Sequence, residues 1–220
     1  MDDKDYRQVT YTQEELFEAG MIREVASAYN IPKQQGEFTI EDYYQLPDDA
    51  RVELIDGVFY DMAVPTQVHQ QISFRIGMSI DKYIQKKKGP CIVHALPMDV
   101  QLDRDNKTMI QPDVLVLCDR GKIRKRSLYG APDFVVEVLS PSTKKKDITI
   151  KLRKYKNAGV REYWIVDPDK KVVYVYEFAE CDFPVVYTFD DKVPVGIFGG
   201  ECEVDFAEIY EYVEFLYEVE

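Results

Sequence analysis

Two short apolar segments, each interrupted by a single carboxylate, place the strongest constraint on how this chain can fold. The first runs from Gln111 to Leu117 and the second from Phe134 to Ser140, and valine and leucine dominate both. Their length and composition predict buried β-strands. Asp113 and Glu137 are unusual there, because an ionised carboxylate is rarely buried unless it is paired or binds a metal. If the two strands are neighbours, both carboxylates can point to one place, as in a Mg²⁺ site.

The order of the predicted elements indicates one α/β domain, bordering on α+β, with a mixed β-sheet flanked by helices. A capping sequence at Thr39 predicts a short helix, and Asp56-Gly57 predicts the turn of a hairpin formed by Arg51–Ile55 and Val58–Met62. Apolar residues at helical spacing predict a long helix from Pro65 to Lys88. The remaining predicted elements are strands over residues 91–95, 98–102, 110–117, 134–139, 162–166 and 172–178 and a helix over 147–158.

The chain divides into three expected segments. Residues 1–37 form an N-terminal extension with a helix candidate at 14–28, residues 38–200 form the main domain, and residues 201–220 form an acidic C-terminal helix. The acidic tail could bind a partner, fold over a basic segment or only keep the end of the chain in solution. The N-terminus is acidic where a signal peptide is basic, and no apolar run reaches the length of a membrane span. We therefore expect a cytoplasmic protein with no membrane partner.

The cysteines give no sign of a metal or disulfide framework. Cys91, Cys118, Cys181 and Cys202 are widely scattered, and the chain has only two histidines to join them in a zinc site. Cys118 ends the first apolar segment, so we expect it to be a small core residue. We expect no disulfide and no functional thiol.

The charge is distributed very unevenly along the chain. The net charge is −12, but residues 120–161 contain 13 lysines and arginines against three carboxylates, a balance of +10. Such asymmetry is typical of a protein with an anionic partner, although a solvated basic surface is an equal alternative for the lysine runs alone. The candidate contacts to nucleic acid are the cations that follow the second apolar segment: Lys144, Lys145, Lys146, Arg153 and Lys154.

Paired carboxylates beside lysines suggest hydrolysis of a phosphodiester. Carboxylates can hold Mg²⁺, which polarises the phosphoryl oxygen, while a lysine orients or deprotonates the attacking water or offsets charge in the transition state. Glu53, in the otherwise apolar strand of the hairpin, is a third candidate acid. Each acid has a structural alternative. Asp113 could cap a turn after Pro112, Glu137 could pair with Arg153 or a lysine, and Glu53 could face solvent.

Three blocks of sequence resemble the Uma-two family of endonucleases. They are Pro112-Asp113, the block from Glu137 to Thr143 that reads EVLSPST, and the block from Gly159 to Pro168 that ends in EYWIVDP. The family is placed in the restriction-endonuclease-like superfamily, whose motif is PD…(D/E)xK. The resemblance extends from about residue 39 to 178 and implies a restriction-endonuclease-like core. It further implies a nuclease that uses Mg²⁺ or Mn²⁺ and acts on nucleic acid, with DNA favoured by analogy.

By the same resemblance, Asp113 and Glu137 are metal ligands, and Glu53 is an upstream acid that supports the metal or its water. The superfamily lysine falls two residues after the second acid, but that position is Leu139. The family points instead to Lys151, on the following helix. The alternative for Lys151 is an ordinary helical pair with Asp147, four residues earlier.

Two further residues are accessory candidates. His69 stands at the head of the long predicted helix, where the family has a histidine, and could contact phosphate or a metal-bound water. Ser140 follows the second acid and could bind phosphate or cap the next helix. The second Pro-Asp pair ends in Asp133, which lies on the same strand as Glu137 and too far from it to share one ion.

The rival hypothesis is a catalytically degenerate module of the same fold that binds nucleic acid or a protein. Leu139 at the position of the usual lysine keeps this rival open. Fold membership alone does not establish activity. Symmetric cutting of a duplex would favour a homodimer, which the sequence leaves undecided.

Overall fold

The computed structural model describes residues 33–47, 49–62, 64–95, 97–140, 144–181 and 183–218. The helix expected over residues 14–28 lies outside these ranges. Within the described ranges, no helix is both long enough and apolar enough to cross a membrane.

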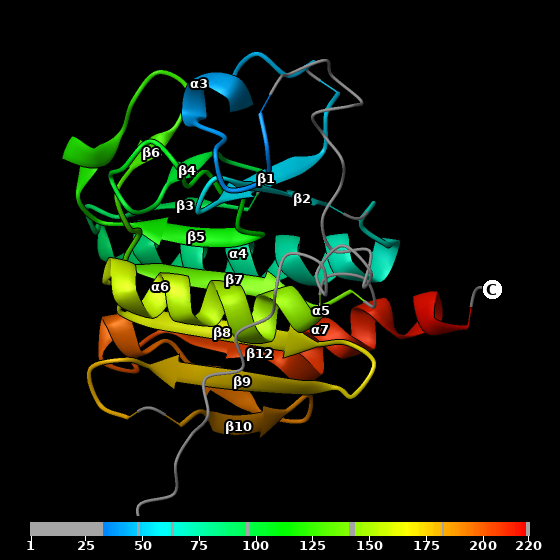
Figure 1. Cartoon of the computed structure of the whole chain (residues 1–220). Helices are drawn as coiled ribbons and strands as arrows, with labels where there is room; N and C mark the ends of the chain where they lie inside the picture. The colour runs from blue at the N-terminus through cyan, green and yellow to red at the C-terminus, as the bar shows by residue number, and fades with distance from the viewer. Residues whose placement is uncertain are drawn as a thin grey trace, which may run out of the picture.

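A mixed six-stranded sheet forms the centre of the molecule (Figure 1). Its strand order is β10-β9-β8-β7-β5-β3. β7 and β8 pair in parallel, and every other neighbouring pair is antiparallel. The six strands are β3 (Ile92–His94), β5 (Val114–Leu117), β7 (Phe134–Val138), β8 (Glu162–Asp167), β9 (Val172–Glu177) and β10 (Val185–Thr188). The mixed sheet flanked by helices confirms the predicted α/β class.

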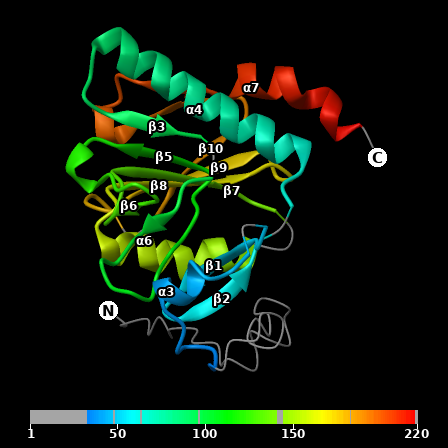
Figure 2. The same ribbon diagram turned by 90° about the horizontal axis from the view of Figure 1, so that it is seen from above.

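Helices cover both faces of the sheet (Figure 2). On one face lie α4 (Gln67–Lys87) and α7 (Phe206–Val213). On the other lies one helical segment composed of α5 (Lys144–Lys146), a π-helical turn η2 (Asp147–Lys151) and α6 (Leu152–Ala158). The sheet is therefore buried on both sides, which explains why its central strands are nearly continuous apolar runs.

Alternation along the central strands separates two cores. Val114 and Val116 of β5 pack in the cluster that contains the buried isoleucines of α4. Leu115 and Leu117 pack in the opposite cluster, which contains Tyr155 of α6. Because side chains alternate between faces, odd-numbered positions on β5 and β7 face the α6 side.

A hairpin and a short helix form a smaller layer beside the sheet. The hairpin is β1 (Val52–Ile55) and β2 (Val58–Asp61), and α3 (Ile40–Tyr43) packs against it in a third apolar cluster. The predicted capping box at Thr39 and the predicted turn at Asp56-Gly57 are both present. Gly57 has φ +77°, and a Cβ there would lie 2.5 Å from the Gly36 carbonyl oxygen, so glycine is required.

Several elements differ from the sequence-based expectations. The helix expected from residue 147 begins at Lys144 and contains the π-helical turn. The acidic end is shared between a strand, α7 and a 3₁₀ turn, and Phe206, Ile209 and Val213 join the main core. The smaller elements are β4 (Val100–Gln101), β6 (Leu128–Tyr129), β11 (Lys192–Pro194), β12 (Glu203–Asp205), η1 (Arg120–Lys122), η3 (Gly196–Phe198) and η4 (Glu214–Tyr217).

The expectation of unpaired cysteines is wrong for one pair. Cys91 and Cys118 form a disulfide. β3 and β5 pair antiparallel with Ile92 opposite Leu117, so the next residues outward, Cys91 and Cys118, face each other. Their separation of 27 residues hid this contact, because the sequence does not reveal which strands pair.

Candidate active site

Asp113 and Glu137 lie next to each other at one end of the sheet. Val114 of β5 pairs with Val136 of β7, so Asp113 and Glu137 come next along the two antiparallel strands. Directly opposed residues project to the same face of a sheet. Both line a cleft of about 540 Å³, together with Glu53, His69 and Lys151. The structure thus brings together the acids, the histidine and the lysine that the sequence singled out.

Glu137 is held through one of its two carboxylate oxygens. Its Oε1 accepts hydrogen bonds from the Lys151 ammonium at 2.8 Å and from the Tyr155 hydroxyl at 2.5 Å. Within the described part of the chain, no donor reaches Oε2. Glu137 is therefore fixed in orientation but keeps one oxygen available for another ligand.

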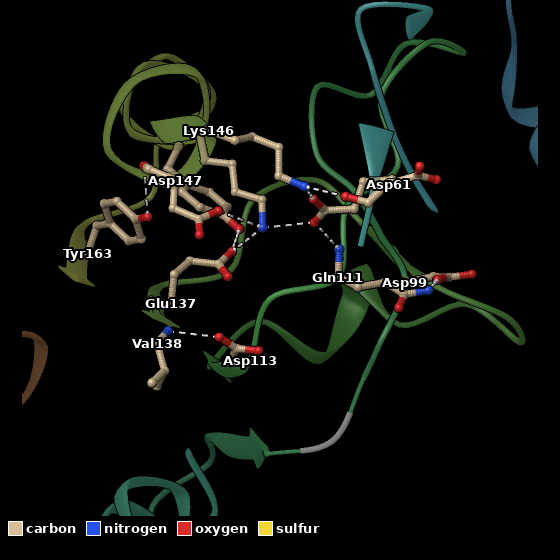
Figure 3. A network of polar contacts seen from close by, with 12 residues as sticks. Asp61, Asp99, Gln111, Asp113, Glu137, Val138, Lys146, Asp147 and Tyr163 are labelled. Carbon is tan, nitrogen blue, oxygen red and sulfur yellow. Dashed lines mark hydrogen bonds and ion pairs between the residues drawn. The ribbon is translucent and has the colours of Figure 1, made fainter. Parts of the chain in front are cut away.

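Asp113 is held in the same way. Its Oδ2 accepts the backbone N–H of Val138 at 2.8 Å, and the His69 Nε2 lies 3.1 Å from the same oxygen. No described residue donates to Oδ1. Figure 3 shows Asp113 below Glu137, with its bond to the Val138 amide. His69 reaches this position from the first turn of α4, where the Thr66 side chain caps the His69 N–H.

Glu53 is buried and has both carboxylate oxygens engaged. Its Oε2 lies 2.7 Å from the Lys146 ammonium. Its Oε1 lies 2.8 Å from the Lys151 ammonium and accepts the Gln111 N–H at 3.1 Å. Burial by itself would raise the pKa of Glu53, but the charges and hydrogen bonds of the two lysines prevail and lower it to about 2. Glu53 is thus an ionised carboxylate that anchors two lysines.

Lys151 is the last residue of the π-helical turn η2 and lies between the acids. Its Nζ contacts Glu53, Glu137 and, at 3.5 Å, Asp147. Leu139, at the superfamily lysine position, is buried in the core on the α6 side. The Lys151 ammonium therefore reaches the acids from the helix instead of the strand. π-Helical turns are rare and frequently occur at functional sites.

The pKa of Lys151 determines which catalytic role its side chain can take. Burial would lower its pKa, but the surrounding Glu137, Glu53 and Asp147 outweigh burial and raise the pKa well above its usual value. Lys151 is consequently an ammonium ion that can stabilise negative charge. It is poorly suited to remove a proton from water.

Burial and the neighbouring carboxylates disfavour the ionised form of Glu137, and a bound cation would favour it. Burial raises the pKa of Glu137 well above its usual value; Lys151 opposes this shift, while Asp113, Asp147 and Glu53 add to it. Mg²⁺ prefers oxygen ligands, uses one or two protein carboxylates and retains several waters. Oδ1 of Asp113 and Oε2 of Glu137, to which no described residue donates, match that donor set. No three His, Cys, Asp or Glu side chains among the described residues are grouped to hold an ion, so a cation here would rest on two carboxylates.

The lysines predicted to contact nucleic acid are placed differently from one another. Lys146 and Lys154 are 3% and 8% exposed and pair internally, Lys146 with Glu53 and Lys154 with Asp56 and Asp103. Both side chains are thus turned inward and are not part of an exposed surface, although Lys146 lines the cleft. Lys144 pairs with Asp167 at 2.8 Å, Arg153 is exposed, and the side chain of Lys145 is outside the described set. Exposed cations also occur in the loop before β6, at Arg124, Lys125 and Arg126.

Ser140 and Asp133 differ in their position relative to the cleft. Ser140 follows β7 and lines the cleft. Asp133 is outside it and accepts the Cys118 N–H at 2.8 Å, in line with its exclusion from the site. Sequence reasoning missed Tyr155, which is one of 16 tyrosines. Its position one helical turn after Lys151 was the available signal.

Comparison with known proteins identifies the family and the fold. The model of the Uma2 family, described as "Putative restriction endonuclease", matches residues 40–192. An uncharacterized protein, slr1290, from Synechocystis sp. is 30% identical over 171 residues, which cover 75% of this chain and 88% of the relative. A crystal structure described as that of "a putative nuclease belonging to DUF820" from Anabaena variabilis superposes with a TM-score of 0.66 at 21% identity, covering 80% of this chain and 99% of that chain. The family match spans well over half of the sequence, and the chain therefore belongs to the Uma2 family.

Proposed function

We propose that this protein is a metal-dependent endonuclease that hydrolyses phosphodiester bonds in nucleic acid, with DNA preferred over RNA. The observation that carries the proposal is the pair of anchored carboxylates. Beside a buried ammonium, Asp113 and Glu137 each use one oxygen for protein donors, and no donor among the described residues reaches the other oxygen. This arrangement suits a divalent cation together with a phosphate.

Mg²⁺ or Mn²⁺, held by Asp113 and Glu137, would polarise the phosphoryl oxygen and lower the pKa of a bound water. Lys151 would stabilise the negative charge that develops on the phosphoryl group, because it remains protonated between two carboxylates. Glu53 positions Lys151 and is less suited to bind metal directly, since lysines and a backbone amide occupy both of its oxygens.

Positively charged groups that line the cleft favour an anionic substrate. The N-terminus of α4 lies at the cleft through His69, and the positive end of a helix dipole favours phosphate. Arg51 also lines the cleft. His69 holds Asp113 in place, and Ser140 is in position to contact phosphate.

The family's description as a restriction endonuclease favours DNA, and we expect the enzyme to act in the cytoplasm.

The test is cleavage of supercoiled plasmid and of a single-stranded RNA with Mg²⁺, with Mn²⁺ and with EDTA. The proposal expects nicked plasmid with either metal, none with EDTA, and at least a hundredfold slower nicking by Glu137→Gln. Salt-sensitive binding without cleavage, equal in the wild type and Glu137→Gln, would instead support a catalytically degenerate binding module.

A further inference from the structure

The Tyr155 hydroxyl shares an oxygen of Glu137 with Lys151, an arrangement that the chemistry proposed above leaves unexplained. Tyr155 is fully buried on α6, and its hydroxyl lies 2.5 Å from Glu137 Oε1. Its ring packs against that of Tyr163 with centroids 4.9 Å apart. The ring is thus fixed by its neighbours, and its hydroxyl is directed at one oxygen of the candidate metal ligand.

We infer that Tyr155 is a positioning residue that orients Glu137 for cation binding; this inference rests on the proposed metal-dependent function. A carboxylate with a single hydrogen-bonded partner can still rotate about its last bond. Two donors on Oε1, one from Lys151 and one from Tyr155, remove that freedom and direct Oε2 away from both. Groups that orient a metal ligand in this way typically contribute 10–100-fold to metal affinity.

The second carboxylate follows the same scheme, which strengthens the inference. Asp113 also has two donors on one oxygen, the Val138 N–H and His69, and its other oxygen accepts from no residue that the structure describes. Each of the two carboxylates is therefore held through one oxygen, which fixes the position of its second oxygen. Loss of the Tyr155 hydroxyl should disturb one member of this pair and leave the other intact.

Tyr163 provides a matched control in the same cluster. It is also fully buried, it touches the Tyr155 ring, and its hydroxyl donates to the Asp147 backbone carbonyl at 3.2 Å. Tyr155→Phe and Tyr163→Phe each remove one buried hydroxyl and preserve the ring. Only Tyr155→Phe removes a hydrogen bond to Glu137.

The experiment is a titration of the full chain with Mn²⁺, with free Mn²⁺ measured by electron paramagnetic resonance and folding checked by circular dichroism. We expect Mn²⁺ to bind Tyr155→Phe about 10–100-fold more weakly than the wild type and to bind Tyr163→Phe within about threefold of it. Unchanged affinity in Tyr155→Phe, or equal losses in both variants, would overturn the positioning role and leave the proposed function standing. A wild-type protein that binds no Mn²⁺ at millimolar concentration would overturn the metal site and this inference together.

Discussion

Glu53 should make the stability of the protein depend on pH in a way that one substitution removes. Its carboxylate is 1% exposed and lies within 2.8 Å of two lysine ammonium groups. Those lysines outweigh the effect of burial and lower the pKa of Glu53 from 4.5 to about 2. Each pKa unit corresponds to about 1.4 kcal/mol, so ionised Glu53 contributes about 3 kcal/mol to the free energy of unfolding.

The direction of the pH dependence follows from the difference in the pKa of Glu53 between the folded and the unfolded protein. Since the pKa is lower in the folded protein, the contribution is fully present above pH 4.5 and is lost as the pH falls towards 2. Glu53→Gln cannot ionise and leaves Lys146 and Lys151 with one partner fewer. We expect it to unfold about 3 kcal/mol more easily than the wild type at pH 7, and expect that difference to approach zero near pH 2.

The assay is urea unfolding followed by circular dichroism, in EDTA, at several pH values from 7 to 2.5. The difference between wild type and Glu53→Gln cancels the contributions of the other carboxylates. Glu201→Gln serves as the control, because Glu201 is an exposed partner of Lys87 and its loss should have little effect on stability at any pH. A wild-type advantage that stays constant from pH 7 to 2.5 would refute the charge network around Glu53.

Three further predictions concern the disulfide, the packing of α4 and the basic loop. Reduction of Cys91–Cys118, or Cys91→Ser, should lower the free energy of unfolding by about 3–4 kcal/mol, because the bond closes a loop with a sequence separation of 27 residues. Urea unfolding with and without reductant measures this difference, and no change would contradict the bond. Gly77→Ala should destabilise the protein by about 1–3 kcal/mol, because its Cβ would collide with the Ala95 Cβ. Ala95→Gly should restore stability in the double variant, and failure of that rescue in thermal unfolding would contradict the contact. Replacing the exposed Arg124, Lys125 and Arg126 with glutamine should make DNA binding less sensitive to salt. The slope of log K against log salt concentration should become shallower by up to about 0.9 for each phosphate that the loop neutralises. Fluorescence anisotropy measures this slope, with a variant that has Lys82, Lys86 and Lys88 changed to glutamine as the control.

Local patterns predicted the elements that surround the site. The turn at Asp56-Gly57, the cap at Thr39 and the isoleucine spacing of α4 depend on neighbouring residues, and the structure confirms all three. The two acid-bearing strands were also identified correctly, since their apolar runs are buried on both faces of the sheet.

What the sequence could not supply depends on contacts between distant segments. The disulfide could be predicted only from the pairing of β3 with β5. The burial of Lys154 could be predicted only from its contacts with Asp56 and Asp103. A run of lysines is typical of an exposed surface, yet Lys146 turns inward because Glu53 on another layer attracts it. The same holds for Tyr155, whose role follows from its distance to Glu137 and from no local pattern.

The most direct test of the proposed active site compares the two Pro-Asp pairs of this chain. Asp113→Asn changes the carboxylate beside Glu137, whereas Asp133→Asn changes one that bonds to the Cys118 amide outside the cleft. Single-turnover cleavage of plasmid DNA in Mg²⁺ should slow at least a hundredfold in Asp113→Asn and stay within about threefold of wild type in folded Asp133→Asn. Wild-type cleavage that survives in Asp113→Asn would contradict the proposed active site.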